Sequence, residues 1–321
     1  MGMADTVTKE YMRSNKVFAD AFNYLIYDGE QVVKSALLQE LDTTEIAIPF
    51  ALDENENSAE DVVQKYRDVL KSAVIMQDAE VSYILLGVEN QTEIHYAMPV
   101  RNIIYDALQY GKQISEVAKR HKSKGDRKGH NKGEYLSGFY KEDRIRPVIT
   151  LVVHFGADEW DGPLSLYDMM DLKNERLLEY VQNYRIFLID PYKLTKDDLK
   201  KFSSSLGDVL GYIKYSKDKK ALSKFLNDNQ VMIMDNDAAR VIRDVTNTPI
   251  YVPDGKGEID MCKAVRDMID ESKQEGMAAG ELNKAKKMAL KMYKKGDSIE
   301  EIAEMAEVSV DQVKEWINSA V

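Results

Sequence analysis

Three polar residues in the first third of the sequence have the types and spacing that metal-dependent phosphodiester chemistry needs. Glu89 and Gln91 end the apolar run VSYILLGVENQ, and strand alternation places both side chains on one face. Asp68 stands just before another apolar run, so a hairpin of the two runs can bring the carboxylates together. Two carboxylates suit Mg²⁺, which keeps waters for a phosphate to share and lowers the pKa of an attacking water. The alternative is a glutamate that only marks where a strand reaches solvent.

The apolar pattern on either side of these residues predicts the elements that must position them. Residues 14–41 have helical spacing with a break at Asp28-Gly29, and Arg101 lies one to two turns into a later helix. Beyond residue 195 the pattern predicts only helices, at 195–228, around 236–244 and at 258–321, with a linker at 246–257. Between these helical parts we expect a hairpin at residues 64–91, a long helix at 94–120, and two further strands at 148–156 and 184–190.

Four segments in this order resemble the recombination-promoting nuclease (Rpn) family, also called PD-(D/E)XK nuclease family transposases: YRDVLKSA, GVENQ, MPVRNIIYDAL and RPVITLVVHFGADEW. The resemblance covers residues 15–190. It implies an α/β, restriction-endonuclease-like core, with a mixed sheet flanked by helices, that cleaves DNA with Mg²⁺. By this resemblance Asp68 and Glu89 are metal ligands, Mn²⁺ is the alternative ion, and Gln91 positions the water or the phosphate.

Gln91 stands where the wider superfamily has a lysine, and an amide cannot stabilise negative charge as an ammonium does. Arg101 is the nearest candidate for the missing cation. Asp20, in the segment FADAF, matches the acidic position of the family's first helix and is expected to be a further metal ligand; the alternative is a helix-surface or capping acid. If the site is weak or inactive, the chain is instead a DNA- or protein-binding module.

A basic, glycine-rich segment at residues 119–134 lacks apolar spacing and is predicted to be a loop. Mobile cations contact phosphates, and glycines let a backbone approach a duplex closely. The expected DNA contacts are five side chains of this loop: Lys122, Lys124, Arg127, Lys128 and Lys132. The alternative is a solvated insertion that binds nothing.

The part of the chain beyond the core is predicted to be a helical extension and linker at 191–257, then a helical region at 258–321. Residues 297–319 have the pattern of a helix-turn-helix-like unit, with Ser309 as the N-cap of its second helix. Its exposed positions are mostly acidic, which favours packing or protein interaction over DNA reading. The C-terminal helices are therefore expected to mediate homo-oligomer formation.

The overall composition limits which partners and which cellular location can be expected. The chain has 321 residues and a net charge of -11, which taken alone disfavours a polyanionic partner, although base gathers at 119–132 and 284–295. No apolar run approaches the length of a membrane span, and no secretory signal is visible at the N-terminus. The single cysteine, Cys262, excludes an internal disulfide, so a cytoplasmic protein is expected.

Overall fold

The computed structural model describes residues 2–41, 44–46, 64–66, 68–77, 80–125, 131–171, 175–229 and 231–319. The chain forms two compact units. The first comprises Met1–Thr248 with Val252–Asp260, and the second comprises Pro249–Tyr251 with Met261–Val321. The first unit therefore contains the predicted core together with most of the predicted extension.

A five-stranded mixed sheet forms the centre of the first unit, in the order β1-β4-β5-β6-β7. The pairs β1–β4 and β4–β5 are antiparallel, whereas β5–β6 and β6–β7 are parallel. The predicted α/β class with a mixed sheet is confirmed. The strands span Gln39–Glu40 (β1), Val69–Gln77 (β4), Glu80–Gln91 (β5), Val148–His154 (β6) and Phe187–Ile189 (β7).

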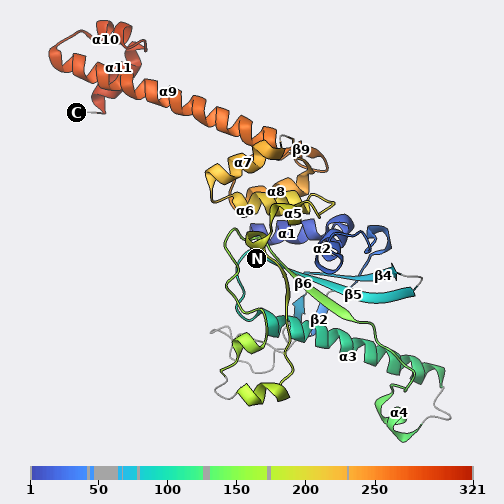
Figure 1. The fold of residues 1–321 in the computed structure, drawn as a ribbon. Coiled ribbons are helices and arrows are strands. Elements are labelled where there is room, and N and C mark those ends of the chain that lie inside the picture. The colour runs from blue at the N-terminus through green and yellow to red at the C-terminus, as the bar shows by residue number, and fades with distance from the viewer. Residues whose placement is uncertain are drawn as a thin grey trace. The chain divides into compact units, whose positions relative to one another are not determined.

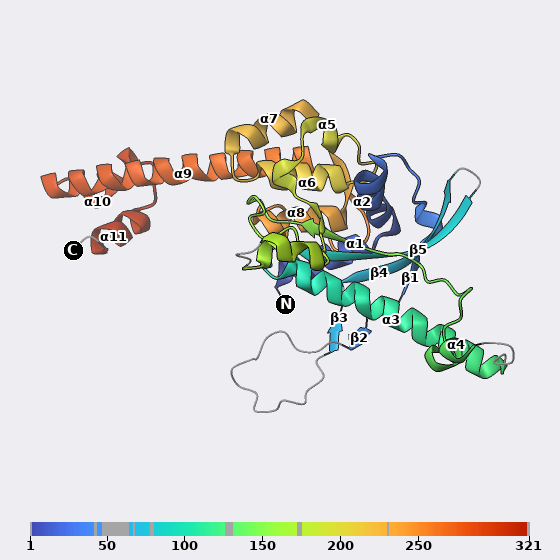
Figure 2. The ribbon, with the colours of Figure 1, turned by 60° about the horizontal axis from the view of Figure 1, so that its bottom comes forward.

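Helices cover both faces of this sheet. α1 (Met3–Arg13) and α2 (Asn15–Tyr27) lie on one face, and α3 (Met98–Lys124) lies on the other (Figures 1 and 2). Residues 84–91 of β5 are all buried, as expected for a strand with helices on both sides. The chain crosses from β5 to the parallel strand β6 through α3 and α4 (Lys132–Ser137).

Further helices of the first unit pack against α1, chiefly through α8. β8 and β9 form a small antiparallel two-stranded sheet beside these helices, so the prediction that the regular structure beyond residue 195 is entirely helical was wrong. Strands of three residues have no recognisable apolar period, which explains the omission. The elements span Lys196–Leu199 (α5), Leu206–Tyr215 (α6), Lys219–Asn229 (α7), Ile233–Asp235 (β8), Asn236–Thr246 (α8) and Glu258–Asp260 (β9).

The segment after α2 also differs from its prediction. α2 ends at Asp28, which has a left-handed backbone with φ of 52°, but no second α-helix follows. The Asn23 side chain bonds both the N–H and the C=O of Val33, at 2.7 and 3.1 Å, and so takes two backbone groups that a helix would use. The remaining short elements are β2 and β3 (Thr44–Ile46 and Gln64–Tyr66, antiparallel) and 3₁₀ turns at Ser35–Leu37, Tyr167–Met169, Glu175–Tyr180 and Pro191–Lys193.

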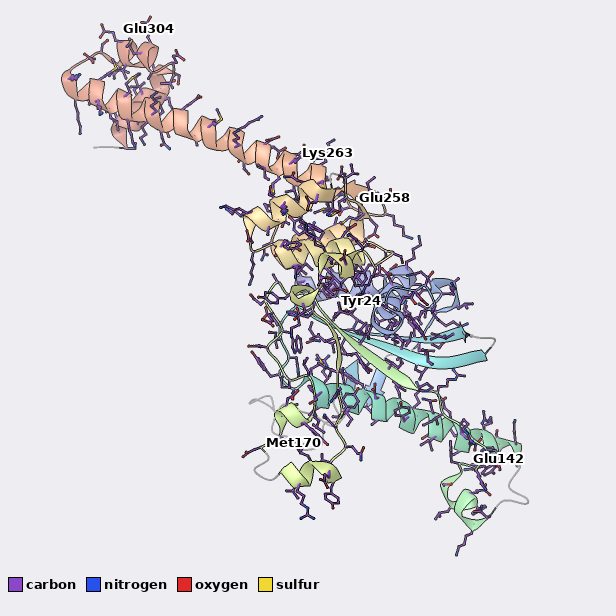
Figure 3. All side chains as sticks on the ribbon, in the orientation of Figure 1. Tyr24, Glu142, Met170, Glu258, Lys263 and Glu304 are labelled. Atoms are coloured by element: carbon purple, nitrogen blue, oxygen red, sulfur yellow. The ribbon has the colours of Figure 1, made fainter. Side chains whose placement is uncertain are left out.

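The second unit consists of α9 (Met261–Lys295), α10 (Ile299–Met305) and α11 (Val310–Asn318). The predicted helix-turn-helix-like unit is confirmed, and the Ser309 side chain caps α11 by accepting a hydrogen bond from the Gln312 N–H. Its core comprises Ala289, Ile302, Ala303, Val313, Trp316 and Ile317. Glu304 is exposed on α10 (Figure 3), in keeping with an acidic surface. Self-association through these helices stays a prediction.

In the described part of the chain, no helix is both long enough and apolar enough to cross a membrane.

Candidate active site

The β4–β5 hairpin brings Asp68 and Glu89 to the same end of the sheet. Val69 of β4 lies opposite Val88 of β5, and the two acidic residues are the next positions beyond this pair. The Asp68 carboxylate also accepts a hydrogen bond of 2.8 Å from the backbone N–H of Asn90. Asp68 is therefore fixed directly beside the end of β5 that carries Glu89, as the hairpin prediction requires.

A cavity of about 240 Å³ opens at this end of the hairpin. Gln91 contributes to its wall, and the Gln91 side-chain amide donates to the backbone carbonyl of Asn90 at 2.9 Å. The cavity thus brings together three of the four predicted catalytic side chains, Asp68, Gln91 and Arg101. Its complete lining is Asp5, Asp68, Asn90, Gln91, Thr92, Glu93 and Arg101.

Glu89, the fourth, lies behind this wall in an ion pair with Arg101. The distance from Arg101 Nη2 to Glu89 Oε2 is 2.9 Å, and the Glu89 side chain is 0% exposed. Arg101 is in the first turn of α3, which the sequence placed close to the hairpin end. Burial alone lowers the pKa of the guanidinium, but the Glu89 and Asp68 carboxylates raise it, and the net shift is upward. One cation therefore already interacts with both acidic residues.

Burial governs the ionisation of Asp68. Desolvation raises the pKa of its carboxyl above the ordinary value of 3.8, although the Asn90 N–H, Lys9 and Arg101 each oppose the shift. Lys9 Nζ lies 3.7 Å from Asp68 Oδ1. A carboxylate that is hard to keep ionised when buried gains from a cation, so this environment favours cation binding.

This raised pKa predicts that Asp68→Asn stabilises the protein at neutral pH. The native state binds the Asp68 proton more tightly than the unfolded state, so the ionised group costs stability above its raised pKa, and the cost is relieved as pH falls toward 3.8. The thermal midpoint of Asp68→Asn should exceed that of the wild type at pH 7, and the difference should shrink on acidification. Asp158→Asn, at an exposed carboxylate, is the control. A lower midpoint for Asp68→Asn at pH 7 would contradict this account.

Two α1 residues in this region escaped the sequence analysis, whose core began at residue 15. The Asp5 carboxylate lines the cavity and accepts a hydrogen bond of 2.5 Å from the Thr92 hydroxyl, and Lys9 pairs with Asp68. Asp5 and Lys9 are four residues apart and so share one face of the helix. This four-residue spacing was the signal that the sequence offered for a helix here. It stands just before Tyr11 and Met12, which are buried in the structure.

Asp20 does not line this cavity. Its buried carboxylate accepts hydrogen bonds from the backbone N–H and the hydroxyl of both Ser203 and Ser204, at 2.6 to 3.0 Å. These bonds fix the segment just before α6 and occupy both oxygens of the carboxylate. The structure thus gives Asp20 a structural role, although it is a buried mid-helix acid and not the surface or capping acid considered from the sequence, and we leave it out of the metal site proposed below.

The basic segment 119–134 is not one loop. α3 continues through Lys124, so Lys122 and Lys124 are exposed helical residues, and Lys132 is the first residue of α4. The helix ends only at Gly125, whose φ of 65° suits a left-handed cap, because no breaker precedes that glycine. The two remaining predicted DNA contacts, Arg127 and Lys128, lie outside the described residues.

The oxygen donors at the hairpin end fit Mg²⁺. Among the described residues no three His, Cys, Asp or Glu side chains are grouped to hold a metal, so the fit is judged on the two ligands predicted from the sequence, Asp68 and Glu89. Mg²⁺ accepts one or two carboxylates and completes its shell with water and phosphate oxygens. Asn90 is among the residues that line the cavity, and its buried amide oxygen has no hydrogen-bond partner in the described part of the chain.

The mixed sheet and its flanking helices define a restriction-endonuclease-like α/β protein. The family model described as “Putative transposase, YhgA-like” matches residues 30–238, well over half of the chain. The chain therefore belongs to this family, that of the Rpn and PD-(D/E)XK transposase-like proteins. No curated protein and no solved structure matches it. Membership indicates a nuclease-type function in DNA processing.

Proposed function

We propose that the protein is a Mg²⁺-dependent DNA endonuclease of the recombination-promoting type. The observation that carries the proposal is the convergence of Asp68, Gln91 and Arg101 on one cavity, with buried Glu89 paired to Arg101 behind it. A fully buried glutamate is costly unless it is paired or binds a metal. Family membership adds a nucleic acid as the substrate class.

In this proposal Asp68 and Glu89 hold the ion, for which Mn²⁺ is an alternative. The ion supplies positive charge at the phosphodiester and lowers the pKa of the attacking water. Asp68, wedged beside the Asn90 N–H, offers one carboxylate oxygen to the cavity at a fixed position. Glu89 reaches the ion only if Arg101 shares its carboxylate or moves aside, because the guanidinium now lies 2.9 Å away.

In this proposal Arg101 and Gln91 together replace the lysine that the wider superfamily has in its active site. The Arg101 guanidinium is 28% exposed and keeps its charge at any physiological pH, so it can stabilise negative charge that develops on the phosphate. The Gln91 side chain lines the same cavity and can orient the water or a phosphate oxygen by hydrogen bonding. Neither residue needs to accept a proton.

A plasmid assay tests the proposal. The wild-type chain should relax or linearise supercoiled DNA in Mg²⁺ but not in EDTA, and the Asp68→Ala/Glu89→Ala double variant should not. Circular dichroism and thermal melting establish that the double variant is folded. If the wild type cuts DNA in Mg²⁺ no faster than the double variant does, the nuclease assignment is wrong.

The second candidate is a catalytically weak or inactive binding module. It is favoured by one observation: Glu89 already has a counter-ion in Arg101, so the acidic pair is neutralised in part without a metal. The same assay separates the candidates when it is joined to a binding measurement, because a module of this kind would bind DNA or a protein with no Mg²⁺-dependent cutting.

A further inference from the structure

A second cavity, of about 470 Å³, lies on the side of α3 that faces β4 and β5. Leu70 and Leu85 form part of its floor, and α3 and the segment after α4 form its walls. Figure 3 marks Glu142 in that segment, near α4 and the far end of α3. Four cationic side chains line the cavity against a single carboxylate: Lys112, Arg120, Arg144, Arg146 and Glu116. We call this cavity the α3 groove.

Among the described residues, two of these cations, Lys112 and Arg144, have no carboxylate partner in an ion pair. Arg120 pairs with Asp143 at 3.5 Å, but Lys112 makes no ion pair with any residue that the structure describes. The Arg144 guanidinium donates to two backbone carbonyls, those of Lys141 and Asp143, which carry no net charge. Four exposed cations around one hollow repel each other, and an anionic ligand relieves that repulsion.

The α3 groove lies on the same side of the sheet as the Glu89–Arg101 ion pair of the candidate active site. Leu85 and Glu89 share one face of β5, four residues or about 13 Å apart. Arg101 and Lys112 share one face of α3, eleven residues apart, which is three turns or about 16 Å. Successive phosphates of a duplex strand advance about 3.4 Å along the axis, so the separation corresponds to about four or five base pairs.

We infer that the α3 groove binds the phosphodiester backbone of the DNA whose cleavage is proposed above, about four or five base pairs from the scissile bond. The inference rests on the proposed function for its substrate. Lys112, Arg144 and Arg146 contact phosphates and fix the register of the strand. Phosphate contacts of this kind position a duplex without reading its sequence. The groove also explains how an acidic chain directs a polyanion to one face.

The test measures binding without cleavage. Fluorescence anisotropy of a labelled 20-base-pair duplex in EDTA, over a series of NaCl concentrations, gives the affinity and its salt dependence. The variant Lys112→Gln/Arg144→Gln/Arg146→Gln should bind at least about tenfold more weakly at 100 mM salt. Its slope of log affinity against log salt should fall by about 2.7, since each phosphate contact contributes about 0.9. The Gln113 bonds to the backbone of Arg146 do not depend on the substituted side chain.

A matched control removes the same three charges elsewhere in the same unit. Lys219→Gln/Lys220→Gln/Lys224→Gln substitutes exposed lysines of α7 and should leave the affinity and the slope nearly unchanged. The single variant Lys112→Gln, at an exposed residue, should lower the slope by about 0.9 and keeps the test valid if the triple variant melts early.

The outcomes separate the groove from the nuclease. If the wild type cuts plasmid in Mg²⁺ but the groove variant binds like the α7 control, the groove inference is wrong and the proposed function stands. If the wild type binds no DNA, the groove inference is again wrong, and the plasmid assay judges the function separately. A duplex RNA of the same sequence is the second arm, and a loss confined to RNA would overturn the assignment to DNA.

Discussion

Replacing Glu89 with glutamine is expected to slow Mg²⁺-dependent DNA cleavage by at least about a hundredfold while the chain stays folded. Loss of a residue that only supports a metal ligand costs about 10- to 100-fold, so loss of a ligand should cost no less. Glutamine keeps the size of the buried side chain and an oxygen for Arg101 to contact, but it removes the charge that the ion needs. Single-turnover cleavage rates and calorimetric titration with Mn²⁺ measure the two effects independently.

The control for this experiment is Glu159→Gln. Glu159 is exposed and pairs with Lys193 at 3.7 Å, so the substitution makes the same chemical change at the surface. It should alter neither the rate nor the Mn²⁺ affinity. A Glu89→Gln protein that still cuts and still binds Mn²⁺ like the wild type would remove Glu89 from the metal site and leave it a structural acid held by Arg101.

The hairpin that carries this site was predictable because its signal is local. An almost continuously apolar run from Val81 to Val88, followed by Glu89 and Gln91, is compatible with a strand buried on both faces and little else. The helix that brings Arg101 was predictable for the same reason. The ion pair at 2.9 Å was not, because it depends on how α3 crosses the sheet, which no sequence spacing fixes.

The features that the sequence did not predict depend on contacts between residues that are far apart in the chain. α1 was missed although it supplies Asp5 and Lys9, because its contacts join residues more than fifty positions apart. Asp20 has the residue type of a metal ligand, and only the distant serines 203 and 204 reveal that its oxygens are occupied. The α3 groove likewise draws its cations from two separate segments, so it did not appear among the concentrations of basic residues visible in the sequence, at 119–132 and 284–295.

Arg101→Ala is expected to lower the free energy of unfolding by about 3 kcal/mol. The substitution leaves the 0% exposed Glu89 carboxylate without its guanidinium, and breaking a buried ion pair costs about 3–5 kcal/mol. The lower end applies because Arg101 is 28% exposed and water can follow it into the space. Chemical denaturation of both proteins at pH 7 measures the difference.

A double-mutant cycle tests whether the stability lost in Arg101→Ala comes from the Glu89–Arg101 ion pair. The Glu89→Gln/Arg101→Ala protein contains no charge at either position, so it should recover most of the stability that Arg101→Ala loses. If the single and the double variant are equally destabilised, the cost arises from lost packing of the arginine stem and the ion pair contributes little.

The same variant also reports on the metal without any cleavage measurement. In the wild type an incoming cation must compete with Arg101 for Glu89, whereas in Arg101→Ala that carboxylate is open to it. Millimolar Mg²⁺ or Mn²⁺ should therefore raise the thermal midpoint of Arg101→Ala by more than that of the wild type, because a ligand that binds only the native state stabilises it. The double variant, which lacks the Glu89 charge, should show a smaller rise than Arg101→Ala. Equal metal-induced shifts in all three proteins would mean that no cation reaches Glu89, and the neutralised pair would then favour the binding module over the nuclease.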